Sequence, residues 1–152
     1  MNAMNTREQI EIDFKEALRT GDELRKRTLR LVLSSIKLME IDQGKEIDEG
    51  ETLAVIQKEI KSYRETIADA ERADRPDLAA DSEAEIEVLE IYLPQPLSQD
   101  EIEAMAKEAI TDVGAASPKE MGKVMKVLMP QVQGRADGSQ VSQIVRRLLE
   151  GE

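Results

Sequence analysis

The sequence predicts an all-α protein, and three observations support this fold class. Apolar residues recur every three or four positions along almost the whole chain, which is the period of one helix face. Capping sequences and glycines mark the beginnings and ends of these periodic segments. No segment of four to eight residues alternates apolar and polar side chains as a half-buried strand does. We therefore expect an N-terminal helical bundle followed by a small three-helix domain.

Two helices are expected before residue 44. The first begins at Thr6, which forms a capping-box pattern with Gln9, and it ends at Gly21. Its apolar face consists of Ile10, Phe14, Ala17 and Leu18. The second helix begins after Asp22 and ends before Gly44. Its apolar set is wide enough to be mostly buried and consists of Leu24, Leu31, Val32, Ile36, Leu38 and Met39.

The next two helices are expected to pair. Asp48 and Glu51 form a second capping box, and the apolar residues behind it step by three and four. They are Leu53, Ile56, Ile60, Tyr63, Ile67 and Ala70. Such a seam suits antiparallel packing at a shallow angle. Pro76 fits the first turn of a fourth helix, and the alternative is a helix that continues through this position with a kink. One face of that helix consists of Leu78, Ser82, Ile86, Leu89 and Leu93.

A stiff connector then divides the chain. Pro94 and Pro96 stand within three residues of each other, so they stop a helix and restrict the backbone between them. We expect a domain boundary here, with an N-terminal bundle over 1–94 and a C-terminal three-helix domain over 98–152. A three-helix unit of this size is marginal on its own.

Start and stop signals define the three short helices of the second domain. Ser98 and Glu101 form a capping box for the first, which ends at Gly114. The second begins around Ser117, Pro118 and Glu120, buries Met121, Val124, Met125 and Leu128, and is limited by Pro130. Asp137 or Ser139 caps the third.

Composition excludes most familiar catalysis. The chain has no Cys and no His, so it lacks a thiolate nucleophile, a His general base and the side chains that usually bind zinc. Glu83, Glu85 and Glu87 do not share a helix face, which argues against a carboxylate metal site. Only three residues are aromatic, too few for the stacking surfaces of many single-strand binders. We expect no catalytic residue, no cofactor and no metal.

The same composition bears on location. The absence of Cys fits a reducing cytoplasm. No apolar run approaches the roughly 18 residues that a membrane span needs. The start, residues 1–7, lacks the basic-then-apolar form of a signal peptide. We expect a cytoplasmic protein that does not enter a membrane.

Charge is distributed unevenly. The chain carries 21 Lys and Arg against 32 Asp and Glu, for a net charge of −11. Residues 65–90 hold ten acidic and two basic side chains, which fits a solvated helix face or the binding of a basic partner. Residues 24–37 hold five basic and no acidic side chains, so nearby acids or a polyanion must offset them. Residues 115–149 hold six basic and two acidic side chains.

The last of these segments contains the candidate RNA-binding residues. Lys119, Lys123 and Lys126 are spaced so that they share one helix face. A glycine-containing loop and two arginines follow, a combination that suits backbone phosphates rather than base edges. The candidates are Lys119, Lys123, Lys126, Gly134, Arg135, Gly138, Arg146 and Arg147. The alternative is an ordinary amphipathic surface with its lysines in solvent.

Several short segments resemble the GatB/YqeY family. They are Tyr92-Leu93-Pro94, Leu97-Ser98, Met121-Gly122-Lys123-Val124-Met125, Met129-Pro130 and Gly134-Arg135-Ala136-Asp137-Gly138. The layout is similar to that of the stand-alone YqeY-like proteins. The resemblance implies kinship with the tail of the B subunit of the tRNA-dependent amidotransferase, which contacts tRNA. It brings no catalysis, because the ATP site and the Ser-Ser-Lys glutaminase of that enzyme lie elsewhere. Ser34 and Ser35, near Lys37, are interpreted as structural.

Three hypotheses follow. The first is a non-catalytic accessory protein that binds tRNA or another structured RNA through its basic C-terminal domain. The second is an adaptor that contacts an amidotransferase or an aminoacyl-tRNA synthetase without binding RNA. The third, a carbon–nitrogen ligase with glutamine as amido-N-donor, is the weakest because no nucleophile–base pair can be assembled.

Overall fold

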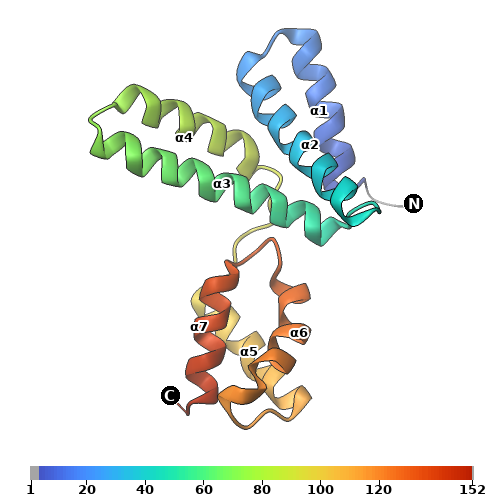
Figure 1. Ribbon diagram of the computed structural model, residues 1–152, viewed down its shortest axis with the longest axis vertical. Helices are drawn as coiled ribbons and strands as arrows, with labels where there is room; N and C mark the ends of the chain where they lie inside the picture. Colours follow the sequence, from blue (N-terminus) through green and yellow to red (C-terminus); the bar gives the residue numbers. More distant parts are fainter. Residues whose placement is uncertain (1–3, 152) are drawn as a thin grey trace. The chain divides into compact units, whose positions relative to one another are not determined.

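The computed structural model describes residues 4–151, and every regular element in that range is helical (Figure 1). The α-helices are α1 Thr6–Thr20, α2 Glu23–Gln43, α3 Glu49–Arg72, α4 Pro76–Glu90, α5 Gln99–Val113, α6 Met121–Val132 and α7 Gly138–Leu149. A 3₁₀-helix, Pro118–Glu120, leads into α6. The all-α prediction is confirmed. None of the helices in this range has the length and apolar character needed to cross a membrane. Residues 1–3, part of the start examined above for a signal peptide, and residue 152 lie outside the described range.

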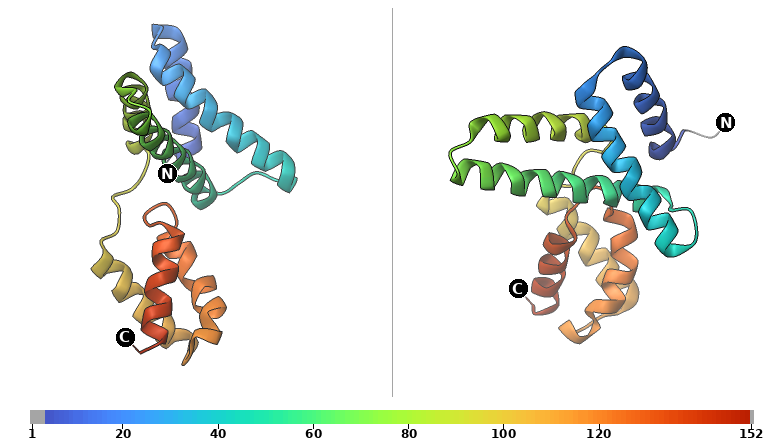
Figure 2. Two further views of the ribbon diagram at one scale, coloured as in Figure 1. Left: turned by 60° about the vertical axis from the view of Figure 1, so that its left-hand side comes forward. Right: turned by 45° about the horizontal axis from the view of Figure 1, so that its top comes forward.

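The chain divides into two compact units, unit 1 (Met1–Leu93) and unit 2 (Pro94–Glu152). In unit 1, α1 pairs with α2, α3 pairs with α4, and the two hairpins cross (Figures 1 and 2). The buried residues of its core are Ile10, Leu29, Val32, Ile36, Ile47, Val55, Ile56, Ile60, Ile86 and Leu89. Most of them are β-branched aliphatics, whose side chains have few χ1 rotamers to choose from.

Helix α1 is capped one residue earlier than the sequence suggests. Asn5, not Thr6, is the N-cap, and its Oδ1 accepts a hydrogen bond of 2.8 Å from the Glu8 N–H. Thr6 instead donates its backbone N–H to Glu49 at the start of α3, at 3.0 Å. The expected capping box of α3 does form, since the Glu51 N–H donates to Asp48 at 2.7 Å. Asn5 with Glu8 and Thr6 with Gln9 have the same local spacing, so spacing alone did not select the correct cap.

The buried face of α2 also differs from expectation. Leu29, Val32 and Ile36 are its buried apolar residues, and each is at most 1% exposed. Leu31 and Leu38 were expected inside but are 43% and 60% exposed. The helix carries more apolar residues than one face can hold, and the neighbouring helices cover only the face with Leu29. Sequence periodicity alone did not select between the two overlapping faces.

Unit 2 has a core of its own, to which α5, α6 and α7 contribute. On α6 the fully buried residues are Val124, Leu128 and Val132, at spacings of four. Pro130 was expected to end this helix, but α6 continues to Val132 with Pro130 inside its last turn. The partly buried methionines that pack against this core are Met105, Met121, Met125 and Met129, whose flexible side chains suit irregular gaps.

Candidate nucleic-acid interface

Three lysines stand on the outside of the second helical segment of unit 2. Lys119 lies in the 3₁₀-helix, and Lys123 and Lys126 lie in α6. All three are exposed, because the inner face of α6 is occupied by the aliphatic residues of the core. None of them forms a salt bridge with any residue in the range 4–151. Their charges are therefore available to an external anion.

Glu120, the acidic residue between these lysines in the sequence, is already engaged at the beginning of this segment. The Glu120 carboxylate accepts hydrogen bonds from the backbone N–H groups of Ala116 and, at 3.2 Å, Ser117. The pKa of Glu120 lies below its ordinary value, mainly because of the bond from Ala116. Glu120 thus stays ionised as a helix cap, and one negative charge stands beside three positive ones.

Gly122 lies on the same surface and was not among the residues selected from the sequence. It is an exposed residue inside α6, its φ is not positive, and a Cβ built on it would meet nothing within 4 Å. Gly122 is the second residue of α6, so it costs at most the roughly 1 kcal/mol that glycine costs relative to alanine in a helix interior, and the open space around it does not require glycine. It precedes Lys126 by one helical turn and adjoins Lys123. A glycine inside an expected helix, without any turn, was the signal available in the sequence.

The loop between α6 and α7 serves the fold of unit 2. Gly134 is buried with φ 85°, a left-handed conformation that favours glycine. Arg135 donates from Nε to the Gln95 carbonyl at 3.3 Å, and its own carbonyl accepts from the Leu97 N–H at 2.9 Å. Gly134 and Arg135, two of the predicted RNA-binding residues, therefore contribute to the fold of unit 2. Gly134 does so through its backbone conformation and Arg135 through its hydrogen bonds. Gly138 begins α7, where a Cβ would lie 3.5 Å from Met129, an ordinary packing distance.

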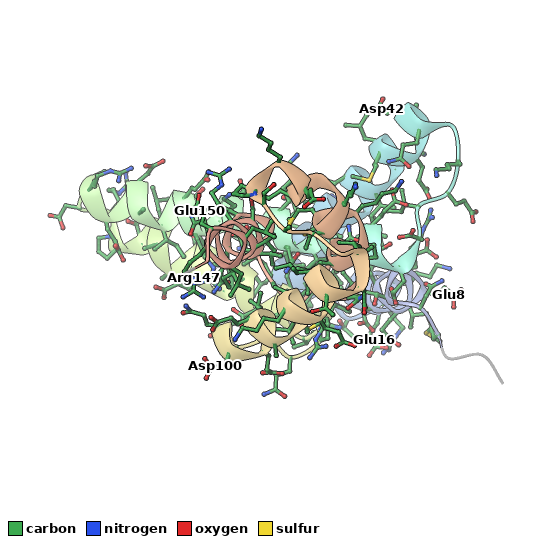
Figure 3. All side chains as sticks on the ribbon, turned by 90° about the horizontal axis from the view of Figure 1, so that it is seen from below. Glu8, Glu16, Asp42, Asp100, Arg147 and Glu150 are labelled. Carbon is green, nitrogen blue, oxygen red and sulfur yellow. The ribbon has the colours of Figure 1, made fainter. Side chains whose placement is uncertain are left out.

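The two arginines of α7 have different surroundings. Arg147 (labelled in Figure 3) places Nη2 2.6 Å from Oε1 of Glu103 and so connects α7 to α5. Arg146 is exposed and has no salt bridge within residues 4–151. The candidate set therefore separates into exposed cations, which are Lys119, Lys123, Lys126 and Arg146, and cations that also hold unit 2 together, which are Arg135 and Arg147.

Three of the five basic side chains in residues 24–37 form ion pairs within unit 1. The ion pairs are Arg25 with Asp13 at 3.9 Å, Lys26 with Glu23 at 2.9 Å and Arg27 with Glu85 at 3.5 Å. Arg30 lies over the Phe14 ring, 5.7 Å from its centroid. Of the two compensations expected from the sequence, the structure shows nearby acids for Arg25, Lys26 and Arg27.

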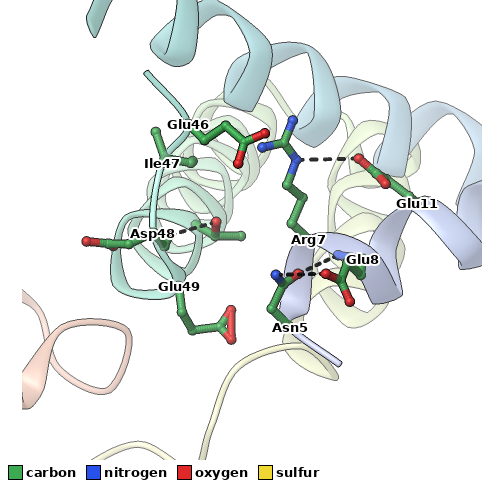
Figure 4. A pocket seen from close by; sticks show the side chains of 9 residues that line it. Asn5, Arg7, Glu8, Glu11, Glu46, Ile47, Asp48 and Glu49 are labelled. Carbon is green, nitrogen blue, oxygen red and sulfur yellow. Dashed lines mark hydrogen bonds and ion pairs between the residues drawn. The ribbon is translucent and has the colours of Figure 1, made fainter. Parts of the chain in front are cut away.

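A cavity of about 260 Å³ in unit 1 lies between the beginnings of α1 and α3 (Figure 4). Arg7 extends into it and is the single basic residue among the nine that line it. Its Nη2 donates to Glu40 Oε1 at 2.8 Å, and its Nε lies 3.4 Å from Glu11 Oε1. The pKa of Arg7 is raised, chiefly by Glu40. Because this cation is already paired, the cavity is acidic and unsuited to phosphate.

Replacing Glu40 by Gln should lower the stability of unit 1. Glu40 also accepts the Ile47 N–H at 3.0 Å, so it joins α1, α2 and the loop before α3. Its pKa is lowered, first by Arg7 and then by the Ile47 N–H. The stabilisation is therefore complete above the unfolded-state pKa, roughly 4.3, and is lost as the pH falls through the lower folded-state value.

Thermal unfolding followed by circular dichroism at several pH values checks this prediction. The unfolding temperature of Glu40→Gln should lie below that of the wild type at pH 7, and the difference should shrink below about pH 4. Glu46→Gln is the matched control, since Glu46 is exposed beside the same cavity without a salt bridge among residues 4–151. A difference that does not change with pH would contradict the assigned role of the Glu40 charge.

Other groups with catalytic potential have structural partners. Ser35 donates from Oγ to Glu59 at 3.1 Å. Tyr92 donates its hydroxyl to Asp13 at 2.5 Å, and burial, followed by the Asp13 carboxylate, raises the pKa of the phenol. Burial likewise raises the pKa of Tyr63, so both phenols stay protonated. No three acidic side chains within residues 4–151 converge closely enough to hold a metal ion.

Comparison with known proteins gives one family and a set of relatives. A family model described as "Yqey-like protein" matches residues 7–149. The protein named "Altered inheritance of mitochondria protein 41, mitochondrial" is 38% identical over 109 residues in Lachancea thermotolerans, covering 70% of this chain and 58% of the relative. In Kluyveromyces lactis the protein of that name is 35% identical over 129 residues, covering 82% and 65%. The chain thus spans about three fifths of the length of these relatives.

These names correct one expectation. The sequence suggested a cytoplasmic protein because it has no Cys and no evident signal peptide. That prediction is wrong by this comparison, since the relatives from Lachancea thermotolerans, Kluyveromyces lactis and Vanderwaltozyma polyspora are all named mitochondrial proteins. The absence of Cys is a weak guide, because it indicates only that no disulfide is needed.

Proposed function

This chain belongs to the YqeY-like family, and we propose that it is a non-catalytic accessory protein that binds tRNA or another structured RNA through unit 2. The observation that carries the proposal is the lysine face, defined as Lys119, Gly122, Lys123 and Lys126. It combines three exposed lysines, which form no salt bridge within residues 4–151, with one glycine that leaves the backbone bare at a single position. The names of the relatives mention no RNA, so the proposal depends on this surface.

The chemistry of the lysine face suits phosphates. Lysine acts as a compact point charge without the planar fork that recognises base edges, so it favours contacts to the backbone. From Lys119 to Lys126 the helix rises roughly 10 Å, enough for the face to reach more than one phosphate. With only three aromatic residues in the chain, stacking on unpaired bases contributes little. A folded RNA with a regular backbone is therefore the expected ligand.

The negative charge of the whole chain sets the conditions for binding. A net charge of −11 repels RNA at long range, while the lysine face attracts it over a distance of about one Debye length, roughly 10 Å at 0.1 M salt. Salt shortens this range and also weakens the gain from counterion release. We expect binding to be weak at physiological salt and strong at low salt, with docking restricted to one face of unit 2.

Fluorescence anisotropy with labelled total tRNA tests the proposal. The full chain should bind at low salt, and log K should fall with log salt with a slope of about −2 to −3, as expected for three phosphate contacts. An RNA duplex and a DNA duplex of equal length serve as comparisons. A chain that binds no tRNA at low salt, or that binds all three polyanions equally, would contradict specific recognition of structured RNA.

Gly122→Ala should raise stability and lower RNA affinity. Alanine removes the helix cost of glycine, so the free energy of unfolding should increase by up to roughly 1 kcal/mol. The added methyl group keeps a phosphate or ribose from approaching the backbone between the lysines, so affinity should fall about threefold to tenfold.

Chemical denaturation and the same anisotropy assay measure the two effects. Thr111→Ala is the matched control, because it should stabilise an exposed position of α5 without adding bulk near the lysine face. It should leave the affinity unchanged. Equal affinities for Gly122→Ala and the wild type would show that no ligand atom approaches Gly122.

A further inference from the structure

The α3–α4 hairpin carries an apolar groove with an acidic rim. The groove has a volume of about 510 Å³, and it lies between two helices that run side by side (Figure 1). Its floor consists of Ile67, Ala68 and Ile86, and its rim consists of Arg64, Glu71, Glu83, Glu87 and Glu90. Ile86 is nearly buried, whereas Ile67 and Ala68 are partly open to solvent. Apolar and acidic side chains thus line the same groove.

The rim is largely uncompensated. Arg64 is its single basic residue, and its Nη2 lies 3.7 Å from Oε1 of Glu90. Glu71, Glu83 and Glu87 are exposed, and their side chains have no salt bridge with residues 4–151. Glu83 and Glu87 are one helical turn apart on α4, a spacing at which like charges repel. Apart from Arg64, the lining residues belong to the segment 65–90, which has ten acidic and two basic residues.

We propose that this groove binds a cationic amphipathic helix of a partner protein. Apolar side chains of that helix would lie on Ile67, Ala68 and Ile86, and lysines or arginines on its flanks would pair with Glu71, Glu83 and Glu87. Neither half of the surface suffices alone, because exposed ion pairs are weak and a floor of three residues is small. Together they select a ligand with both an apolar stripe and positive edges.

The length of the groove defines the ligand further. From Arg64 to Glu71 the helix α3 rises roughly 10 Å, which corresponds to two turns. A bound segment of two to three turns, with apolar residues at positions i, i+3 or i+4, and i+7, would cover it. The proposal concerns unit 1 and does not rest on RNA binding by unit 2. RNA and anionic lipid are excluded as occupants, because both would meet the unpaired carboxylates with like charge.

A designed peptide pair tests the groove on the full chain. The first peptide has two heptads of Leu and Lys with one apolar face, and the second has the same composition in a scrambled order without such a face. Fluorescence anisotropy at about 0.15 M salt compares them under moderate screening. The amphipathic peptide should bind about tenfold more tightly than the scrambled one, or better.

Variants then distinguish binding in the groove from general attraction to an acidic protein. Glu83→Gln with Glu87→Gln removes two rim charges and should weaken binding of the amphipathic peptide about tenfold. Glu65→Gln with Asp81→Asn removes two charges from the same helices at positions that do not line the groove. This variant should change the affinity for the amphipathic peptide by less than about twofold. Ala68→Phe fills the floor without a charge change and should also weaken binding. The variant Glu83→Gln with Glu87→Gln removes the repulsion between two carboxylates, so it should remain folded even if Ala68→Phe does not.

Each contrary result would overturn the proposal. Equal binding of the two peptides, or equal losses in the two charge variants, would show general attraction to an acidic protein. Full affinity in a folded Ala68→Phe variant would show that the floor is unused. Sedimentation equilibrium without peptide provides the last check. A dimer that Glu83→Gln with Glu87→Gln dissociates would mean that a second copy of this chain occupies the groove instead of a partner.

Discussion

Replacing Lys119, Lys123 and Lys126 together by Glu should abolish tRNA binding by the full chain. All three side chains are exposed and free of salt bridges within residues 4–151, so the fold loses no charge pair. The change removes three phosphate contacts and adds three repulsive ones. At low salt we expect the affinity to fall at least about 100-fold, and any residual binding should lose its salt dependence.

The control must match the charge change, because the variant also shifts the net charge from −11 to −17. Replacing Lys37, Lys58 and Lys61 by Glu produces the same shift in unit 1, at three exposed positions on α2 and α3. If the lysine face is the binding site, this control should lose less than about tenfold, an effect of long-range repulsion alone. Equal losses in the two variants would contradict a local site and leave only the effect of total charge.

Local sequence signals predicted the helices well because the same residues that signal a helix also stabilise it. The capping box of Asp48 and Glu51 and the stop at Gly44 both appear where expected. The failures involve choices that spacing alone does not decide. Thr6 was assigned as a cap, yet its backbone N–H binds Glu49, and the choice between Leu29 and Leu31 depends on which helices cover α2. Neither fact is encoded in spacing.

The candidate site likewise contains residues that the local sequence could place and residues that it could not. Lys123 and Lys126 could be placed outside from the pattern of α6, because the helix period fixes which side faces the core. The pattern could not show that Arg147 pairs with Glu103, which precedes it by 44 residues, or that Arg135 binds the Gln95 carbonyl. Likewise, residues 65–90 appear acidic in the sequence, but the groove exists only where α3 lies against α4. The charge of a segment can be counted from the sequence, whereas ion pairs and grooves depend on how the chain folds.

Replacing Leu128 by Ala should unfold unit 2 while leaving unit 1 helical. Leu128 is fully buried in α6, and a Leu→Ala change in a core costs about 2–5 kcal/mol. A unit of this size rarely has a free energy of unfolding above about 3–5 kcal/mol. The cavity left by Leu128→Ala would therefore remove most of its stability. The two cores share no buried residue, so α1 to α4 should keep their packing.

The neighbouring residue provides the matched control. Val127 is 36% exposed on the same helix, so Val127→Ala should change the free energy of unfolding by less than about 0.5 kcal/mol. Circular dichroism at 25 °C should show partial loss of helix only for Leu128→Ala, and tRNA binding should disappear with it. The triple Lys→Glu variant should instead lose binding with its helix content intact. A Leu128→Ala variant that unfolds completely would show that the stability of unit 1 depends on unit 2. Binding of tRNA by an unfolded unit 2 would mean that the lysines do not need their helix to bind RNA.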